Sequence, residues 1–137
     1  MNHLRKTRLV YNSRKSSKGC PFCADATGER KVIKNKHSYV VPNLTKYDFW
    51  ELYRVTDHLL LIPYKHVKHL GELGKEAKLE IVNIISDYES KGYSVYARGQ
   101  GFKSRSVEHQ HTHLIKTDNK KSRGAFFLEK PYFLARF

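Results

Sequence analysis

Apolar and polar positions in the first half of the chain predict short strands joined by loops. Residues 31–42 contain two apolar stretches separated by a turn at Asn35-Lys36, a pattern typical of two short strands. Residues 44–56 contain four aromatic side chains without a clear period, and we expect a long loop there. The apolar run from Leu59 to Ile62 is too short for a helix and ends at a proline, which predicts a buried strand.

The second half predicts one long helix followed by two strands. From Gly74 to Ser90, apolar residues recur at spacings of three and four, and Gly92 follows as a stop signal. The apolar positions of this helix are Leu79, Val82, Ile85 and Tyr88, with Ile81 and Ile84 beside them. Residues 93–98 and 107–116 are expected to form strands. The predicted fold class is α+β, an antiparallel sheet of about five strands with one long helix and a short second helix.

Length and charge limit the organisation of the chain. Its 137 residues suit one domain, and 26 basic against 13 acidic residues give a formal charge of +13. Residues 1–18 hold six basic residues and no acid, so we expect a flexible basic arm before a domain at 19–137. A positive surplus of this size favours phosphate-bearing partners.

Composition also excludes several classes of protein. No stretch reaches the 18 apolar residues that a membrane span requires, and no secretory signal is visible, so we expect a cytoplasmic protein without a membrane partner. Two cysteines are too few for a disulfide scaffold.

Three histidines alternate with other residues at His109, His111 and His113. In a strand, alternate side chains point to the same face, so the three imidazoles are expected to form a row. Imidazole near neutral pH is a nucleophile, a metal ligand and a proton carrier. In a chain of charge +13, neighbouring positive charges should keep a clustered imidazole neutral. The alternative is an accidental group of surface histidines.

The motif resembles that of the histidine triad (HIT) nucleotide hydrolases and transferases. The segment His58 to Val67, which reads HLLLIPYKHV, is similar to a second motif of that family. Cys20-Pro21-Phe22-Cys23 resembles the Cys-x-x-Cys found near the start of many members. The matching segments cover residues 20 to about 116 in the family's order and approximate spacing.

The resemblance implies a mechanism and its residues. The central histidine, His111, would attack the α-phosphorus of a nucleotide and form a covalent nucleotidyl-histidine. His113 and His58 match positions that contact phosphate, and Ser106 matches a hydroxyl beside the leaving group. No catalytic metal is implied.

Nucleotide-binding residues also follow from the resemblance. Asn43 matches a ribose contact, and basic groups at Arg98 and Arg105 can take over a phosphate contact that relatives make with other residues. Three apolar residues match positions around the nucleobase, with plain core packing as the alternative: Phe22, Val41 and Leu60. The sequence departs from the family at Gln110 and Thr112, where apolar residues are usual, so that side of the strand is expected to be less dry.

The two cysteines have the spacing of a zinc knuckle. The resemblance supplies two further ligands, and the expected structural zinc site consists of Cys20, Cys23, His66 and His109. A redox Cys-x-x-Cys and buried free thiols are the alternatives.

The predicted function is hydrolysis at the α-phosphate of a nucleotide conjugate, of the dinucleoside polyphosphate or nucleoside phosphoramidate type. The branch that resembles galactose-1-phosphate uridylyltransferase has glutamine as the third triad residue, so His113 favours hydrolysis over transfer. The alternatives are an aprataxin-like deadenylase or other nucleic-acid-associated protein, a nucleotidyltransferase, and a zinc-stabilised binding module without turnover. A homodimer is expected by analogy alone.

Overall fold

The computed structural model describes residues 3–4, 19–25 and 28–123. In these ranges seven strands form one sheet, with two α-helices and a 3₁₀ helix beside it. The elements are β1 (His3–Leu4), α2 (Pro21–Asp25), β2 (Ile33–Lys34), β3 (Ser38–Pro42), β4 (Phe49–Trp50), β5 (Tyr53–Pro63), η1 (Leu70–Glu72), α3 (Lys75–Ser90), β6 (Ser94–Tyr96) and β7 (Thr112–Lys121). The predicted α+β fold with one long and one short helix is confirmed. Of the expected arm at residues 1–18, only β1 belongs to the described residues, where it pairs with β4.

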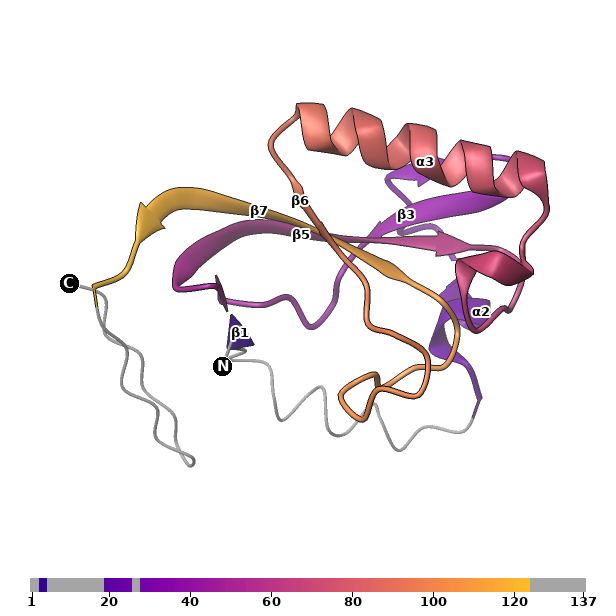
Figure 1. The fold of residues 1–137 in the computed structure, drawn as a ribbon, viewed down its shortest axis with the longest axis horizontal. Helices are drawn as coiled ribbons and strands as arrows, with labels where there is room; N and C mark the ends of the chain where they lie inside the picture. The colour runs from indigo at the N-terminus through magenta and orange to yellow at the C-terminus, as the bar shows by residue number, and fades with distance from the viewer. Residues whose placement is uncertain (1–2, 5–18, 26–27, 124–137) are drawn as a thin grey trace.

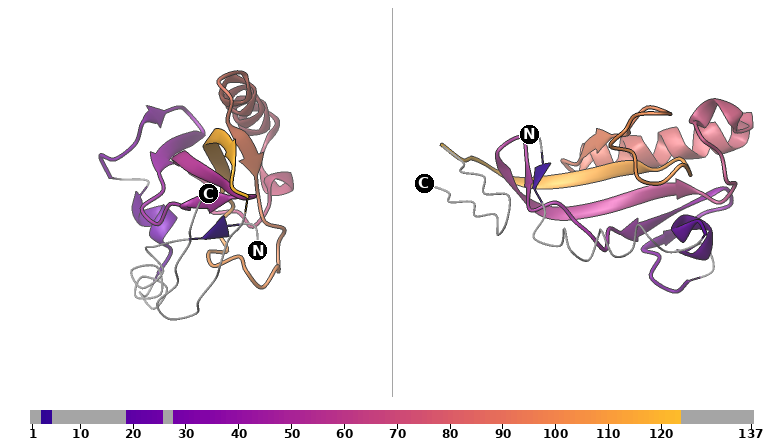
Figure 2. Two further views of the ribbon diagram at one scale, coloured as in Figure 1. Left: turned by 90° about the vertical axis from the view of Figure 1, so that its left-hand side faces the viewer. Right: turned by 90° about the horizontal axis from the view of Figure 1, so that it is seen from below.

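Strand β5 organises the sheet. It pairs antiparallel with β7 along one edge, and with β3 and β4 along the other. Outside this centre, β6 pairs with β7 and β2 pairs with β3. Helix α3 lies along the upper face of the sheet in Figure 1, whereas α2 and the loop from β6 to β7 lie below it. The end-on view of Figure 2 shows α3 and α2 on opposite sides of the sheet. The described residues contain no helix that is long and apolar enough to cross a bilayer.

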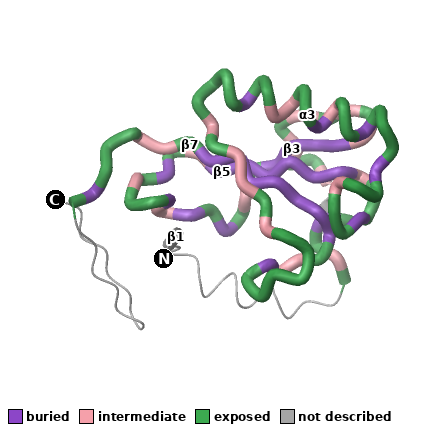
Figure 3. Tube along the Cα trace, viewed as in Figure 1, coloured by how far each residue is buried: buried purple, intermediate pink, exposed green. Residues whose placement is uncertain are grey.

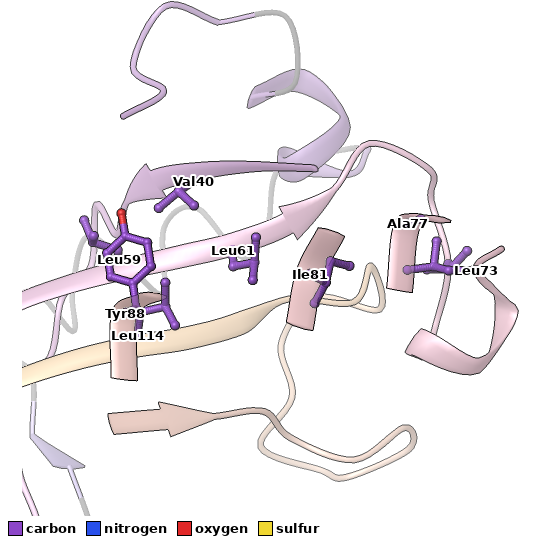
Figure 4. Packing of buried hydrophobic residues seen from close by; sticks show 9 residues of the cluster. Val40, Leu59, Leu61, Leu73, Ala77, Ile81, Tyr88 and Leu114 are labelled. Carbon is purple, nitrogen blue, oxygen red and sulfur yellow. The ribbon is translucent and has the colours of Figure 1, made fainter. Parts of the chain in front are cut away.

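Alternation along the strands divides the core between the two faces of the sheet. Leu59, Leu61 and Leu114 belong to the cluster that α3 covers (Figure 4). Leu60 and Ile62 belong to a second cluster together with residues of α2 and β3. Buried positions therefore concentrate on the central strands, where both faces are covered (Figure 3). His58 and His113 are the direct neighbours of Leu59 and Leu114, which face α3. Because side chains alternate along a strand, the two histidines point to the opposite face of the sheet.

The predicted helix is confirmed, but the apolar stripe proposed for it is wrong in part. Ile81 and Tyr88 are buried as expected, together with Ala77. Leu79 and Val82 instead face solvent, with 62% and 58% of their surface exposed. Apolar residues occur on two stripes of this helix, and only the stripe that meets the sheet is covered. The spacing alone identifies a helix without deciding between two such stripes.

Ile81 and Leu79 provide a direct test of this orientation. Ile81→Ala should lower the free energy of unfolding by about 2–4 kcal/mol, since it leaves a cavity against the sheet. Leu79→Ala on the exposed stripe should change it by less than about 0.5 kcal/mol. Urea denaturation of both variants measures the difference, and equal losses would contradict the orientation.

The predicted loop at 44–56 is a second correction. Its end forms a tight hairpin, in which β4 and the start of β5 pair through Phe49 with Arg54 and Trp50 with Tyr53. The two turn residues, Glu51 and Leu52, have φ angles of 50° and 70°. Both values suit a two-residue type I′ turn, which usually contains Asn-Gly or Asp-Gly. The sequence does not predict this turn, because neither Glu51 nor Leu52 is a residue that commonly adopts a positive φ angle.

The strand boundaries around the histidines also differ from the prediction. Strand β7 begins at Thr112 rather than at residue 107, and β6 ends at Tyr96. In the segment before β7, the backbone N–H of Gln110 donates to the backbone carbonyl of Val67 at 2.7 Å. This bond joins the end of the histidine motif to the segment that follows β5.

Candidate functional site

The histidines of the two central strands meet on the face of the sheet opposite α3. Residue His113 pairs with Leu60, and His58 pairs with Ile115, so the two imidazoles come from adjacent strands two positions apart. His58 Nε2 lies 2.9 Å from His113 Nδ1. The rings of His111 and His113 have centroids 5.2 Å apart. All members of the 109–113 triad are buried, which excludes an accidental group of surface histidines.

His111 is held as a neutral imidazole with one free ring nitrogen. Its Nδ1 donates to the carbonyl oxygen of His109 at 2.9 Å, so Nε2 carries the lone pair. Burial, more than any neighbouring charge, lowers the pKa of His111 to about 4. The cations of Arg105 and Arg98 act in the same direction. The expectation of a neutral imidazole is met, but desolvation rather than repulsion is its main cause.

Hydrogen bonding also determines the tautomers of His58 and His113. The backbone N–H of Tyr47 donates to His58 Nδ1 at 3.0 Å, so this nitrogen carries no proton. His58 Nε2 then bears the proton and donates it toward His113 Nδ1. The remaining nitrogen of a neutral His113, Nε2, is therefore also a donor. This chain of bonds leaves His113 with a donor at Nε2, the nitrogen that lies 3.4 Å from Arg98 Nη1.

Asn43 lies beside the same pair. Its Oδ1 accepts from the backbone N–H and the hydroxyl of Thr45, at 3.0 and 3.2 Å. Its Nδ2 lies 3.2 Å from His58 Nε2. The side chain predicted to contact a ribose therefore sits at the histidine pair, with its amide oriented by the following turn.

The two arginines predicted to bind nucleotide have different surroundings. Arg98 follows β6, and its Nη1 lies 3.4 Å from His113 Nε2. Arg105 is buried and donates to three backbone carbonyls, those of Lys68, Val107 and Glu108. Its guanidinium therefore holds the loop before His109, and a structural role describes it better than a phosphate contact. The half-buried Ser106 lies in the same loop.

The three apolar residues predicted around the nucleobase lie together on this face. Phe22, Val41 and Leu60 form one buried cluster with Tyr39 and Ile62. The centroids of the Phe22 and His111 rings lie 4.9 Å apart. Val41 is almost fully buried, as core packing requires, whereas Phe22 lies directly beside the central histidine.

The prediction that the strand face of Gln110 and Thr112 is more accessible to water is wrong. Gln110 and Thr112 are both buried, and the Gln110 amide donates to the Thr112 hydroxyl at 3.1 Å. This hydrogen bond offsets part of the cost of burying the two side chains.

Four metal-ligating side chains converge beside this row. The ligand atoms of Cys20, Cys23, His66 and His109 all lie within 4.8 Å of one another. Helix α2 starts at Pro21, a residue favoured at the first helical position, and its turn brings both sulfurs to one side. The hydrogen bond from the backbone N–H of Gln110 to the Val67 carbonyl brings His66 and His109 together, with ring centroids 4.6 Å apart.

This donor set fits a tetrahedral zinc ion. Zinc bonds of about 2.3 Å to sulfur and 2.0–2.1 Å to nitrogen place neighbouring ligand atoms roughly 3.5 Å apart. The Cys20 and Cys23 sulfurs lie 3.5 and 3.6 Å from His109 Nδ1, and the Cys23 sulfur lies 3.2 Å from His66 Nδ1. His109 Nε2 donates to the Pro63 carbonyl at 2.8 Å, which leaves Nδ1 free to ligate. Burial and the adjacent Cys20 sulfur raise the pKa of Cys23, a crowding that a cation would relieve.

Comparison with known proteins identifies the fold. No family model and no curated protein matches the chain. Among solved structures, a "Hit Like Protein" aligns over 73% of this chain and 100% of its own, with 17% identity and a TM-score of 0.58. A histidine triad nucleotide-binding protein from Candida albicans aligns over 80% and 83%, with 21% identity and a TM-score of 0.54. A zinc-bound histidine triad family protein from Mycobacterium smegmatis aligns over 74% and 76%, with 15% identity and a TM-score of 0.56.

The chain has the histidine triad fold. In this fold, one contributor to the site was not predicted from the sequence. Tyr47 supplies the backbone N–H that orients His58. The centroid of its ring lies 4.4 Å from that of the His58 ring and 5.5 Å from that of the His113 ring. The available signal was the group of aromatic side chains between residues 44 and 56, which includes Tyr47.

Proposed function

We propose that this protein is a nucleotide hydrolase that cleaves at the α-phosphate of a nucleotide conjugate through a covalent adduct on His111. The observation that carries the proposal is the state of His111, a neutral imidazole whose Nδ1 is engaged and whose Nε2 holds a lone pair. Similar folds support the choice, since one solved relative is described as a HIT family hydrolase from Legionella pneumophila.

In the first step, His111 Nε2 attacks the α-phosphorus, and the bond from phosphorus to the leaving group breaks with its electron pair on that group. A phosphate leaving group departs as an anion, whereas an amine leaving group also takes up a proton from solvent. The His109 carbonyl that accepts from Nδ1 stabilises the positive charge that develops on the ring. The donors of His113 and Arg98 are positioned to stabilise phosphoryl oxygens. In the second step, water attacks phosphorus and releases a proton to solvent, and the nitrogen–phosphorus bond breaks with its electron pair returning to Nε2.

Zinc has a structural role in this proposal. Ligation of Cys20, Cys23, His66 and His109 would tie α2 to the segment that leads into β7. His109 also supplies the carbonyl that orients His111, so the ion would hold the nucleophile in place indirectly. Asn43 and Phe22 remain the proposed contacts for ribose and nucleobase.

Trapping the adduct tests the proposal. The protein is mixed with diadenosine tetraphosphate or adenosine 5′-phosphoramidate and quenched in alkali, because the nitrogen–phosphorus bond is labile in acid. Intact mass spectrometry should show the added mass of one adenylyl group, and peptide mapping should place it on His111. Turnover without an adduct in rapid-quench samples, or an adduct on another residue, would contradict the proposal.

A further inference from the structure

A row of three polar side chains crosses the sheet on the face that α3 covers. Strands β5, β7 and β6 lie side by side (Figure 1), Asp57 of β5 pairs with Lys116 of β7, and Tyr93 directly precedes β6. The Tyr93 hydroxyl donates to Asp57 Oδ2 at 2.5 Å. The Lys116 ammonium lies 5.4 Å from the centroid of the Tyr93 ring, which packs on the cluster beneath α3. This row therefore links three neighbouring strands on the face opposite the histidines.

The carboxylate of Asp57 also holds the backbone at His58. Its Oδ1 accepts from the backbone N–H of His58 at 2.9 Å. Just before this point on β5, the register with β7 shifts between Val55 and Asp57. Just after it, pairing of β5 with β3 ends at Leu59, opposite Pro42. The Asp57 side chain therefore secures the main chain of β5 where pairing shifts on one edge and ends on the other.

The hydroxyl of Tyr93 remains a proton donor in this row. Burial, and after it the hydrogen bond to Asp57, raises the pKa of Tyr93. A hydrogen bond from a hydroxyl to a carboxylate is charge-assisted and stronger than one between neutral groups. Tyr93 thus holds one oxygen of Asp57, while the other oxygen holds the backbone of His58.

On the opposite face, the His58 ring depends on where its backbone lies. Its Nδ1 accepts from the Tyr47 backbone N–H at 3.0 Å, and its Nε2 lies 2.9 Å from His113 Nδ1. Hydrogen bonds of this length weaken steeply when their distance or angle changes. A small movement of the His58 main chain would break the bond to His113. The proton of His113 would then no longer be fixed on Nε2.

We infer that Asp57 and Tyr93 are positioning residues for the His58–His113 pair, which they align from the far face of the sheet through the backbone of His58. The inference rests on the proposed function in that the aligned pair holds phosphoryl oxygens during turnover. Both positioning side chains lie on the α3 face, so they act on a phosphate only through the histidines. A misaligned donor lowers kcat more than it raises KM, because charge on the phosphoryl oxygens matters most in the transition state.

Two variants remove this support in steps, and steady-state assays with diadenosine tetraphosphate measure the result. Tyr93→Phe keeps the ring but loses the hydroxyl, and it should lower kcat by about 3-fold to 10-fold. Asp57→Ala also loses the acceptor for the His58 N–H, and it should lower kcat by about 10-fold to 100-fold. In both variants KM should change by less than about twofold. A rise in KM with an unchanged kcat would contradict the inference.

Asp57→Asn is the conservative variant. Its side-chain oxygen can still accept from the His58 N–H, and its amide can donate to the Tyr93 oxygen. This variant should therefore keep most of the turnover that Asp57→Ala loses. The double variant Asp57→Ala/Tyr93→Phe should be no slower than Asp57→Ala alone, because both changes break the same chain of bonds. Additive losses would show that Tyr93 acts on turnover by another route than Asp57, and would overturn the inference.

The matched control is Ser38→Ala. The Ser38 hydroxyl donates to Glu80 Oε1 at 2.5 Å, and Glu80 also accepts from the His37 backbone N–H at 3.1 Å. This bond has the same chemistry as the bond from Tyr93, but Ser38 pairs with Pro63 at the far end of β5. Ser38→Ala and Tyr93→Phe should lower the urea midpoint of unfolding to a similar extent, whereas only Tyr93→Phe should lower kcat. Equal losses of kcat would reject the positioning role in favour of general stability.

Nuclear magnetic resonance of isotope-labelled imidazole nitrogens tests the inference without turnover. In the wild type, the hydrogen bonds predict that His58 and His113 each carry their proton on Nε2. In Asp57→Ala the His113 signals should move toward those of mixed tautomers, and in Ser38→Ala they should not move. If the wild type turns over no nucleotide conjugate, the proposed function fails while these spectra still decide the role of Asp57. Unchanged His58 and His113 signals in Asp57→Ala would overturn that role.

Discussion

Replacing His111 with asparagine is expected to lower kcat for release of nucleoside monophosphate by about a thousandfold or more. Asparagine lacks the ring nitrogen whose lone pair attacks phosphorus in the proposed mechanism. The groups expected to hold the phosphate, on His113 and Arg98, are unchanged. Nucleotide binding, measured by calorimetry, should therefore remain within about threefold of the wild type. Steady-state assays with diadenosine tetraphosphate measure the loss of turnover.

A matched control for this variant is His69→Asn. His69 is exposed and caps η1 through its side chain, which accepts from the Gly71 amide at 3.1 Å. Asparagine is also a good capping residue, so this variant should keep wild-type turnover. If His111→Asn retained near wild-type rates, another group would have to be the nucleophile. If His111→Asn lost nucleotide binding together with turnover, the main role of the His111 imidazole would be to bind the nucleotide.

Removal of the proposed zinc is expected to destabilise the domain strongly. Cys23→Ser should lower the melting temperature by roughly 10 °C or more, corresponding to a loss of about 2–3 kcal/mol. Without the ion, α2 loses the bonds through its cysteines and keeps the Phe22 contacts and the hydrogen bond from the Tyr39 hydroxyl to the Phe22 carbonyl at 2.6 Å. Thermal unfolding followed by circular dichroism measures the change, and elemental analysis should find one zinc per wild-type chain.

Chelation provides the control for this second prediction. A strong chelator should lower the melting temperature of the wild type but leave that of Cys23→Ser unchanged, since the variant has already lost a ligand. Turnover of the chelated wild type should fall as well, because His109 both ligates the metal and orients His111. A metal-free wild type with full thermal stability would contradict the structural zinc.

The sequence was sufficient where chemistry depends on local spacing. The i, i+2, i+4 histidines predicted a row of imidazoles, and the spacing of Cys20 and Cys23 predicted a zinc knuckle. The spacing of apolar residues between 74 and 90 likewise predicted the long helix, because the 3.6-residue period is visible within one segment. Local regularities of this kind are imposed by backbone geometry, which the sequence carries directly.

Contacts between distant segments could not be obtained in this way. The sequence alone determined the α+β class, the helix and the histidine and cysteine motifs. Tertiary structure decided which stripe of α3 is buried, that Arg105 binds backbone carbonyls, and that Arg98 lies beside His113. It also placed the Tyr47 amide on His58, through a hairpin whose turn residues are unusual. The physical reason is that sheet register and burial depend on many segments at once, whereas the helical period and the strand alternation depend on one.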